Sequence, residues 1–372
     1  MLGGVKAENV SYSDLGRNDA GNSGVFVSSG EIYKDLSDIS ISKEVNQVVY
    51  GVLVTDNAVL KSNNESINIS AENSGNGAGY TSVVGVGAEV LTSGNKYTDG
   101  GTIYLGEKGI TKDIQVSATA TKEGTYAIGL DAARVVGGDS QDPAGPSKIY
   151  VSGDNLTINV NHLADSNQCA AVGIMAQNNT GDATNRSSVM IDTENTIINV
   201  YNPQDSTVGI QAFSQGLVDV NSNIEIHASD VISARGNAIV NINADGQHST
   251  KLYGDVDFAY DQPTSGTPVD AQLNINLSGA DSVWVGNSKV TVGSGSATPS
   301  DEYLQVSAFK LAINDEAQWT TDEDSFVNSL SMNHGIININ GDAAQTVNIG
   351  TMQGTGTVNM KTAKSANGFS AG

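Results

Sequence analysis

The sequence contains one cysteine, six prolines and few aromatic residues, which make up 5% of the chain. The single Cys169 excludes an intrachain disulfide, and its apolar neighbours indicate a small buried side chain. The low proline content, together with recurrent Ile, Val and Leu at alternate positions, disfavours a disordered linker. No run of about eighteen apolar residues occurs, so the sequence predicts no transmembrane helix.

Basic residues are also scarce. The chain has 18 Lys and Arg against 41 Asp and Glu, and its formal net charge is −23. Such an acidic surface repels phosphate backbones and anionic lipid, so we expect neither nucleic acid nor membrane binding. The four histidines are scattered and no glycine-rich phosphate loop opens a helix, so the sequence predicts no metal and no cofactor.

The most prominent feature of the sequence is a repeated pattern of short strands. A short apolar-Gly-apolar segment recurs with its glycines 34, 44, 44 and 36 residues apart, and two further short strands follow most copies. A repeat that cannot bury its own apolar face requires stacked neighbours, so we expect coils of three parallel strands over residues 48–230. The repeated glycines are Gly51, Gly85, Gly129, Gly173 and Gly209.

Two alternatives remain open at this point. The connections at 153–155 and 194–195 are short enough for local hairpins. Asparagines recur near strand ends, where their amides either stack along the coil axis or serve ordinary turns. These are Asn155, Asn159, Asn195, Asn199, Asn221 and Asn223.

The last part of the chain, residues 319–361, alternates apolar and polar residues between Gly- and Asn-containing turns. It reads Trp319, then Val-Asn-Ser-Leu-Ser-Met-Asn from 327, Ile-Asn-Ile-Asn-Gly from 337, and Val-Asn-Ile-Gly from 347, followed by Gly-Thr-Gly-Thr-Val-Asn-Met from 354. Over these forty or so residues it resembles the end of pertactin-like autotransporter passenger domains, where the autochaperone segment caps the fold.

The resemblance implies an all-β, right-handed parallel β-helix with a C-terminal β cap. We divide the chain into an N-terminal cap or frayed strands (1–47), a β-helix passenger (48–318) and a truncated capping segment (319–372). It further implies type V secretion through the periplasm of a Gram-negative bacterium to the cell surface or beyond. The family's translocator barrel is absent from this sequence, and this segment itself is not expected to insert into the membrane.

Loops of variable length at one corner of the coils are the expected binding region, because insertions at one corner project from one face of a solenoid. They span residues 92–101, 136–147 and 177–187. We expect an adhesin or self-association module whose partner is a host-surface protein, a glycan or a second copy of the chain. The candidate partner-binding residues are Asp139, Asp142, Asn178, Asn179, Asp182 and Asn185.

Two other functions compete with adhesion. A carbohydrate-active lyase or hydrolase would need clustered carboxylates, for which the acid pairs Asp139 with Asp142 and Asp182 with Asp192 are candidates. Ser140 lacks the context of a serine-protease nucleophile, because Gln141 follows it and every histidine comes later in the chain. The third function is a stalk that binds nothing itself. The sequence therefore predicts no catalytic residue.

Deleting residues 319–372 tests whether this segment stabilises the coils before it. A solenoid ends in an open strand edge and an exposed core end, so removing a cap should increase proteolysis of the preceding coils. We expect this deletion to lower protease resistance more than deletion of residues 1–47, measured by limited proteolysis of both truncations. Equal resistance would mean that the segment is an ordinary last coil.

Overall fold

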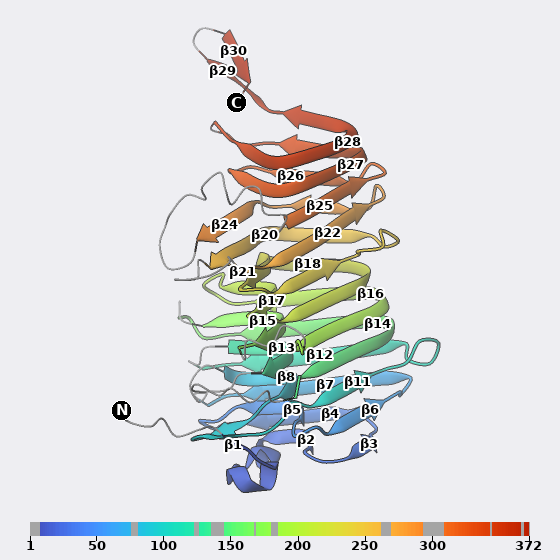
Figure 1. Ribbon diagram of the computed structural model, residues 1–372, viewed down its shortest axis with the longest axis vertical. Helices are drawn as coiled ribbons and strands as arrows, with labels where there is room; N and C mark the ends of the chain where they lie inside the picture. Colours follow the sequence, from blue (N-terminus) through green and yellow to red (C-terminus); the bar gives the residue numbers. More distant parts are fainter. Residues whose placement is uncertain are drawn as a thin grey trace.

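The computed structural model describes residues 8–75, 81–122, 126–134, 145–166, 169–179, 185–261, 269–292, 309–342, 344–365 and 368–371. Within these ranges the regular elements are β-strands, apart from two short 3-10 turns, η1 (Tyr12–Leu15) and η2 (Asp19–Asn22). The strands stack along the long axis of an elongated molecule, with residues 23–33 toward one end of the stack and residues 325–360 toward the other (Figure 1). The all-β prediction is confirmed.

Most strands belong to three columns, in which each strand pairs in parallel with its counterpart before and after it. Column A contains β2 (Ser23–Val27), β5 (Val49–Val54), β8 (Thr81–Glu89), β13 (Tyr126–Arg134), β15 (Ala170–Asn178), β17 (Thr207–Phe213) and β24 (Ser288–Val292). Column B contains β3 (Glu31–Tyr33), β6 (Val59–Ser62), β11 (Thr102–Leu105), β19 (Ile239–Ile242), β22 (Gln272–Ser278) and β25 (Phe309–Asn314). Column C contains β4 (Ile39–Lys43), β7 (Ser66–Asn73), β12 (Asp113–Ala120), β23 (Val283–Val285) and β26 (Gln318–Thr321).

Six longer strands pass through more than one column or along the last rungs. They are β14 (Lys148–His162), β16 (Ser188–Tyr201), β18 (Leu217–Arg235), β20 (Thr250–Asp261), β27 (Ser325–Ile339) and β28 (Val347–Met360). The chain visits columns A, B and C in a repeating order, and we call one such passage a rung. Antiparallel pairs among the described strands are short: β9 (Thr92–Ser93) with β10 (Lys96–Tyr97), β20 with β21 (Val269–Asp270), and β29 (Thr362–Ser365) with β30 (Gly368–Ala371).

The connections at 153–155 and 194–195 are not hairpins. Residues 153–155 lie inside β14, which pairs in parallel with β16 from Lys148 to Asn161. The asparagines at this corner form an amide ladder, because Asn195 donates from Nδ2 to Oδ1 of Asn155 at 3.0 Å and Asn223 donates likewise to Asn195 at 3.3 Å. None of these asparagines has a positive φ, so amide stacking rather than left-handed turn geometry accounts for their recurrence.

The interior is one continuous apolar core, built from residues that stack on their counterparts in successive rungs. Side chains at alternate positions of a strand share one face, so strands in register place like residues over like residues. Each fully buried aliphatic side chain contributes roughly 1.5–3 kcal/mol of transfer free energy. One core row of column C runs through Ile69, Val116, Ile158, Ile198, Ile226, Leu252, Trp284, Trp319 and Ile337.

The repeated glycines of column A pack against this row. A Cβ added at Gly129 would lie 2.4 Å from Cγ2 of Ile158 and 2.5 Å from the carbonyl oxygen of Gly173. Gly51, Gly85, Gly173 and Gly209 meet the same pair of neighbours, a core methyl group and the backbone of the next rung, at 2.3–2.7 Å. These distances are shorter than any real Cβ contact, so only glycine fits where the two columns approach.

Trp319 does not cover the end of the core. It is fully buried and stacks on Trp284 with ring centroids 4.8 Å apart, and further rungs in β27 and β28 lie beyond it. The last of these, β28, is mostly exposed, and its Met352, Val358 and Met360 are about half exposed, at 53%, 48% and 47%. The described residues 319–342 therefore continue the columns.

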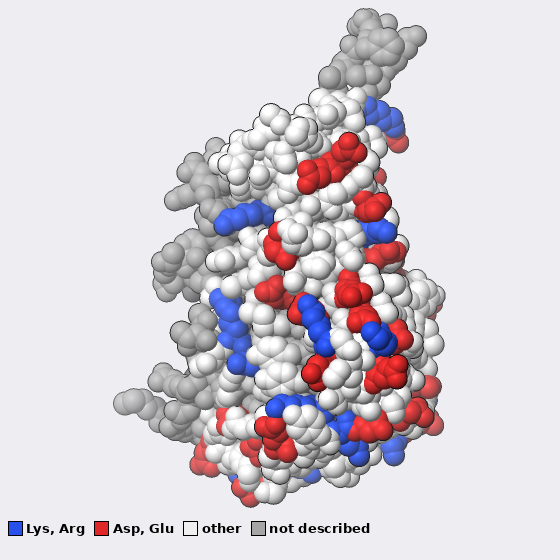
Figure 2. Space-filling view, turned by 90° about the vertical axis from the view of Figure 1, so that its right-hand side faces the viewer, with Lys and Arg blue, Asp and Glu red and all other residues white. Residues whose placement is uncertain are grey.

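Charged side chains lie interspersed on the face shown in Figure 2. Ion pairs join neighbouring rungs, such as Lys61 with Glu31 at 2.5 Å and Lys112 with Asp154 at 2.7 Å. These pairs lie at the surface, where solvent screens the charges, so each contributes little to stability. Rung stacking therefore depends on the core and the backbone rather than on surface charge.

Replacing Gly129 with Ala tests the close approach between columns A and C. We expect a loss of about 1–3 kcal/mol of stability, because the new methyl group overpacks the core against Ile158 and the next rung. The measurement is the melting temperature followed by circular dichroism. Gly94→Asn is the matched control, because Gly94 has open space around it and asparagine tolerates its left-handed φ of 61°. An unchanged melting temperature for Gly129→Ala would contradict this packing argument.

Candidate functional site

A second apolar cluster lies outside the core, on the outer face of column A. Side chains of a strand normally alternate between the core face and the outer face, but at each repeated glycine the glycine and the next residue both face the core. In β5, Val49 and Val52 therefore belong to the core, whereas Tyr50 and Leu53 belong to the outer cluster. The remaining buried members are Leu15, Val84, Leu91, Ile128, Val172, Met175 and Val208. Column A therefore presents an apolar outer surface in addition to its core face.

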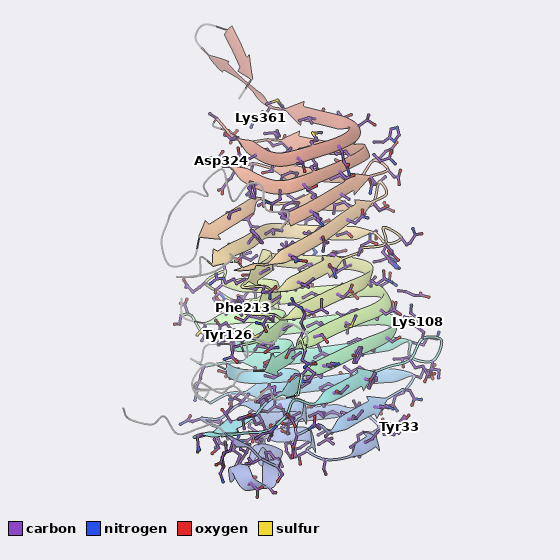
Figure 3. All side chains as sticks on the ribbon, in the orientation of Figure 1. Tyr33, Lys108, Tyr126, Phe213, Asp324 and Lys361 are labelled. Carbon is purple, nitrogen blue, oxygen red and sulfur yellow. The ribbon has the colours of Figure 1, made fainter. Side chains whose placement is uncertain are left out.

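A cleft of about 530 Å³ opens on this outer surface. Its apolar lining consists of residues that come shortly before or after the repeated glycines in the sequence. Among them are the aromatic residues Tyr126 and Phe213, which lie on the same side of the molecule in Figure 3. Its polar lining is Arg17, Tyr50, Glu89, Thr92, Asp131 and Gln177. Concave sites with apolar walls and a few convergent polar groups are the usual form of ligand sites.

Two buried carboxyl groups lie in the cleft. Tyr50 donates its hydroxyl to Oε2 of Glu89 at 2.9 Å, and burial raises the pKa of Glu89 to about 7. Asp131 is 5% exposed, and its Oδ1 has no hydrogen-bond partner. Burial, followed by the charge of Glu89, raises the pKa of Asp131 well above its usual range. Such perturbed carboxyl groups in a cleft mark candidate functional sites.

Arg17 reaches the cleft from the N-terminal segment but is already occupied. It donates from Nε and Nη2 to the two carboxylate oxygens of Asp19, at 2.8 and 2.7 Å, and from Nη1 to the carbonyl oxygen of Thr92 at 2.8 Å. This bidentate pairing, together with the partial burial of both groups, fixes the guanidinium at the edge of the cleft. It moderates the negative potential at Glu89 without bonding to that carboxyl.

The roots of all three predicted loops meet at this cleft. Thr92, Ala133 and Gln177 all line it. Thr92 and Gln177 begin the segments 92–101 and 177–187, and Ala133 lies three residues before the segment 136–147. The first of these segments is not a free loop: it forms the β9–β10 hairpin, pairs with β1 (Glu8–Asn9) and buries Tyr97 and Thr98.

The six candidate partner-binding residues divide into two groups. Asp139, Asp142 and Asp182 lie outside the described residues, as does Ser140. Asn178 is fully buried and donates from Nδ2 to the carbonyl oxygen of Asn185 at 2.9 Å, so it closes the root of its loop. Asn179 and Asn185 are exposed beside it. The structure does not test these six as a binding set.

Sequence reasoning missed Tyr50, Glu89 and Asp131. A signal was present, because Glu89 and Asp131 are single acids inside otherwise apolar strands, at outward positions following a repeated glycine. Their burial depends on Arg17 and Leu15, which are distant in the sequence. Tyr104 and Tyr150, which are far apart in the sequence, stack with ring centroids 4.8 Å apart on column B.

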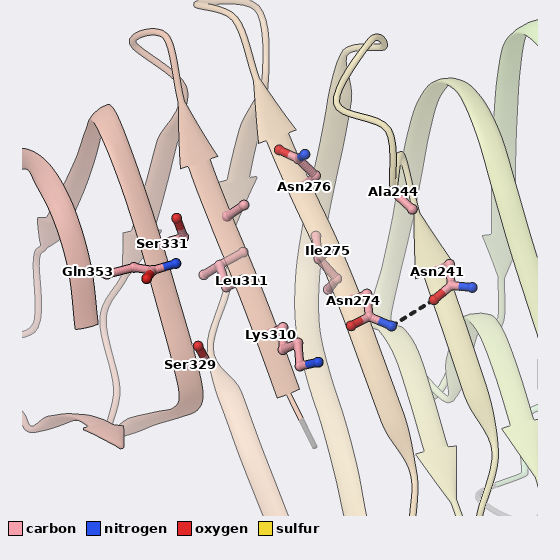
Figure 4. Close-up of a pocket in the computed structure, with 11 residues that line it drawn as sticks. Asn241, Ala244, Asn274, Ile275, Asn276, Lys310, Leu311, Ser329, Ser331 and Gln353 are labelled. Atoms are coloured by element: carbon pink, nitrogen blue, oxygen red, sulfur yellow. Dashed lines mark hydrogen bonds between the residues drawn. The ribbon is translucent and has the colours of Figure 1, made fainter. Parts of the chain in front are cut away.

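A second depression, of about 370 Å³, lies on column B near β22 and β25 (Figure 4). Two asparagines of its lining bond within the amide ladder: Asn274 donates to Oδ1 of Asn241 at 2.8 Å, and Asn276 accepts from Asn314 at 3.1 Å. Lys310 contributes the one charge in its lining. The described residues of its lining contain no carboxyl group, in contrast to the cleft on column A.

Other chemistry has little support within the described ranges. These residues contain no group of three or more His, Cys, Asp or Glu that could hold a metal ion. Cys169 is buried, and Asp192 is exposed and paired with Lys108 at 2.6 Å. No helix in this part of the chain is long and apolar enough to span a membrane.

Comparison with known proteins adds no relative. No protein-family model matches the chain, and neither a curated protein nor a solved structure matches it. The function is therefore inferred from the residues of the chain and their geometry.

The titration of Glu89 predicts that stability falls with rising pH. Because its pKa is about 7 in the folded protein against 4.5 ordinarily, the stabilising contribution of its proton is complete below about pH 4.5 and is lost as pH rises through 7. The loss is on the order of 3 kcal/mol, and Asp131 acts in the same direction.

Melting temperatures at about pH 5 and pH 8 measure this effect. Glu89→Gln should show a smaller difference between the two pH values than the unmodified protein, because glutamine keeps an acceptor for Tyr50 but does not titrate. Glu65→Gln, at an exposed position, is the control and should leave the difference unchanged. If Glu89→Gln keeps the full difference, Glu89 is not the titrating group.

Proposed function

We propose that this chain is a surface-displayed or secreted passenger of the autotransporter type, folded as a right-handed parallel β-helix, that acts as an adhesin or self-association module. It reaches the cell surface of a Gram-negative bacterium through the periplasm. Its partner is a host-surface protein, a glycan or another copy of itself. The cleft on the outer face of column A, together with the variable segments whose roots line it, forms the binding region.

The fold assignment is supported by the parallel columns. Each rung passes through columns A, B and C, and strands pair with their counterparts one rung away, as a solenoid requires. The sequence of residues 319–361 adds the resemblance to passenger ends. A lone cysteine also suits export, because no disulfide-closed loop hinders threading through a pore.

One observation carries the binding function: the roots of the three variable segments line a cleft that contains a buried, unpartnered acceptor. A stalk has no need of such a group, because an unsatisfied buried acceptor costs roughly 1–3 kcal/mol. Asp131 Oδ1 is such an acceptor, in a cleft with apolar walls. Because this unpartnered acceptor lowers the stability of the fold and lies in a cleft, it favours a ligand-binding protein over a purely mechanical stalk.

A second candidate function is a carbohydrate-active enzyme. The observation that favours it is the pair Glu89 and Asp131, two carboxyl groups with raised pKa values in one cleft. General acid catalysis of glycosidic cleavage uses a carboxyl group that stays protonated near neutral pH. Glu89 and Asp131 would then be the acid and its partner, in place of the aspartate pairs considered from the sequence.

Display on a laboratory bacterium, by fusion to a translocator barrel, tests the proposal. We expect the displayed chain to confer adhesion to host cells or glycans, or cell aggregation. Replacing residues 137–143 and 180–184 with short Gly-Ser linkers should reduce that activity at least about tenfold, since in the sequence both segments follow within a few residues of Ala133 and Gln177, which line the cleft. The same replacement at 263–267, in a segment that follows β20, is the matched control.

Release of reducing ends or unsaturated products from a polysaccharide panel is scored alongside. Products that disappear in Glu89→Gln and Asp131→Asn would establish the enzyme in place of the adhesin. Adhesion that survives both loop replacements, with surface display unchanged, would show that another surface carries binding.

A further inference from the structure

The outer face of column A holds a row of residues aligned across successive rungs, each two positions after a repeated glycine. Gly87, Asp131, Met175 and Gln211 follow one another in this row. Two of the four carry buried acceptor oxygens with no hydrogen-bond partner, Oδ1 of Asp131 and Oε1 of Gln211. Both side chains are more than nine-tenths buried, at 5% and 7% exposure.

Gly87 leaves room for a second acid to join this row. A Cβ at Gly87 would lie 2.9 Å from Oε1 of Glu89 and 3.3 Å from the Tyr50 ring, so the Glu89 side chain folds over the glycine. That fold brings Glu89 close enough for its charge to act on Asp131. The cleft therefore gathers acceptor oxygens at one place in an apolar surrounding.

Two of the donors that surround the cleft, Tyr50 and Arg17, are committed elsewhere, and no donor among the described residues reaches Oδ1 of Asp131. Tyr50 donates to Glu89, and Arg17, the one Lys or Arg among the described lining residues, gives its bonds to Asp19 and Thr92. Buried acceptors in native proteins almost always have a donor. The missing donor at Asp131 is therefore best supplied by a bound group.

The acidic groups and the aromatic residues of the cleft indicate what kind of hydrogen-bond donor it binds. Acidic side chains draw a cation, and the chain's net charge of −23 strengthens that attraction. Aromatic faces attract cations, and Phe213 at the cleft already holds one, with the Arg235 guanidinium 5.7 Å from its ring centroid. Tyr126 offers a second ring in the lining.

We propose that the cleft binds a positively charged amino or guanidinium group carried on an apolar body, with Asp131 and Glu89 accepting its hydrogen bonds and the aromatic walls packing against its stem. This inference rests on the proposed binding function and names its ligand class. The same chemistry occurs in a free amine and in a lysine or arginine side chain of a partner protein.

Binding of a cation is linked to proton release. A bound ammonium group favours the charged forms of Glu89 and Asp131, which burial otherwise holds protonated, so affinity rises with pH through about 7. Asp19, Arg17 and Tyr50 are the other charged or titratable groups that face Glu89. Arg17 and Asp19 are paired with each other, and the hydrogen bond from Arg17 to Asp19 raises the pKa of the guanidinium above its ordinary value.

Calorimetric titration of the full chain with benzylamine and benzyl alcohol tests the charge requirement. Benzylamine should bind at least about tenfold more tightly than the alcohol, the difference expected when hydrogen bonds to charged groups are lost. Its affinity should increase from pH 6 to pH 8, with protons released to the buffer. Equal affinities of the two probes, or no binding of benzylamine at either pH, would overturn the inference.

A short peptide with one lysine in an apolar context, and the same peptide with acetyl-lysine, distinguish the two sources. Tighter binding of the lysine peptide than of benzylamine indicates a protein partner, whereas the reverse order indicates a free amine. Selective loss of binding in the acetylated peptide supports the cation site in either case. Equal binding of both peptides contradicts it.

Asp131→Asn should weaken benzylamine binding at least about tenfold without lowering the melting temperature, because asparagine removes a buried carboxyl group that has an unpartnered oxygen. Glu65→Gln is the exposed control and should bind normally. Unchanged binding in Asp131→Asn would overturn the assignment. If displayed cells still adhere through the loops while no amine binds, the proposed function survives and only the ligand class fails.

Discussion

The close approach of column A to column C at the repeated glycines is the constraint on which the rest of the structure depends. At each of these positions the backbone of the next rung and a core methyl group occupy the space that a side chain would need. The glycine faces inward together with the residue after it, so the alternation of side chains shifts by one. Rung after rung, this shift fills the core on one side and builds an apolar surface on the other.

The outer cleft follows from the same shift. Tyr50, Asp131 and Met175 point outward because they lie at fixed positions around a glycine, and rung stacking aligns them with the residues of neighbouring rungs. The N-terminal segment then packs Leu15 and Arg17 against this surface. Burial of Glu89 and Asp131, and the raised pKa values that result, are therefore products of the stacked strands together with one covering segment.

The sequence predicted the strands and their parallel stacking because period-two alternation and a recurring glycine are local signals. It left open whether the asparagines near strand ends stack or turn, because both uses place Asn at the same position; the ladder from Asn155 to Asn223 shows that they stack. The cleft was not predicted, since single acids such as Glu89 and Asp131 look like surface residues until the segment with Leu15 and Arg17 covers them; Arg17 lies 72 residues before Glu89 and 114 before Asp131. A capping segment was expected to begin at residue 319, because nothing local in the sequence distinguishes the last rung from one of the preceding rungs.

The stacking direction has a consequence for how the molecule responds to tension. Hydrogen bonds between parallel strands run perpendicular to the strands, along the long axis of the stack. A force applied at the two chain ends therefore loads the bonds of an end rung first, and rungs separate one after another rather than shearing together. With 34–44 residues between successive glycines, each separated rung adds about 120–150 Å of extended chain. A molecule of this kind lengthens in steps when it is pulled along its axis, and so behaves as an extensible chain of rungs rather than a rigid rod.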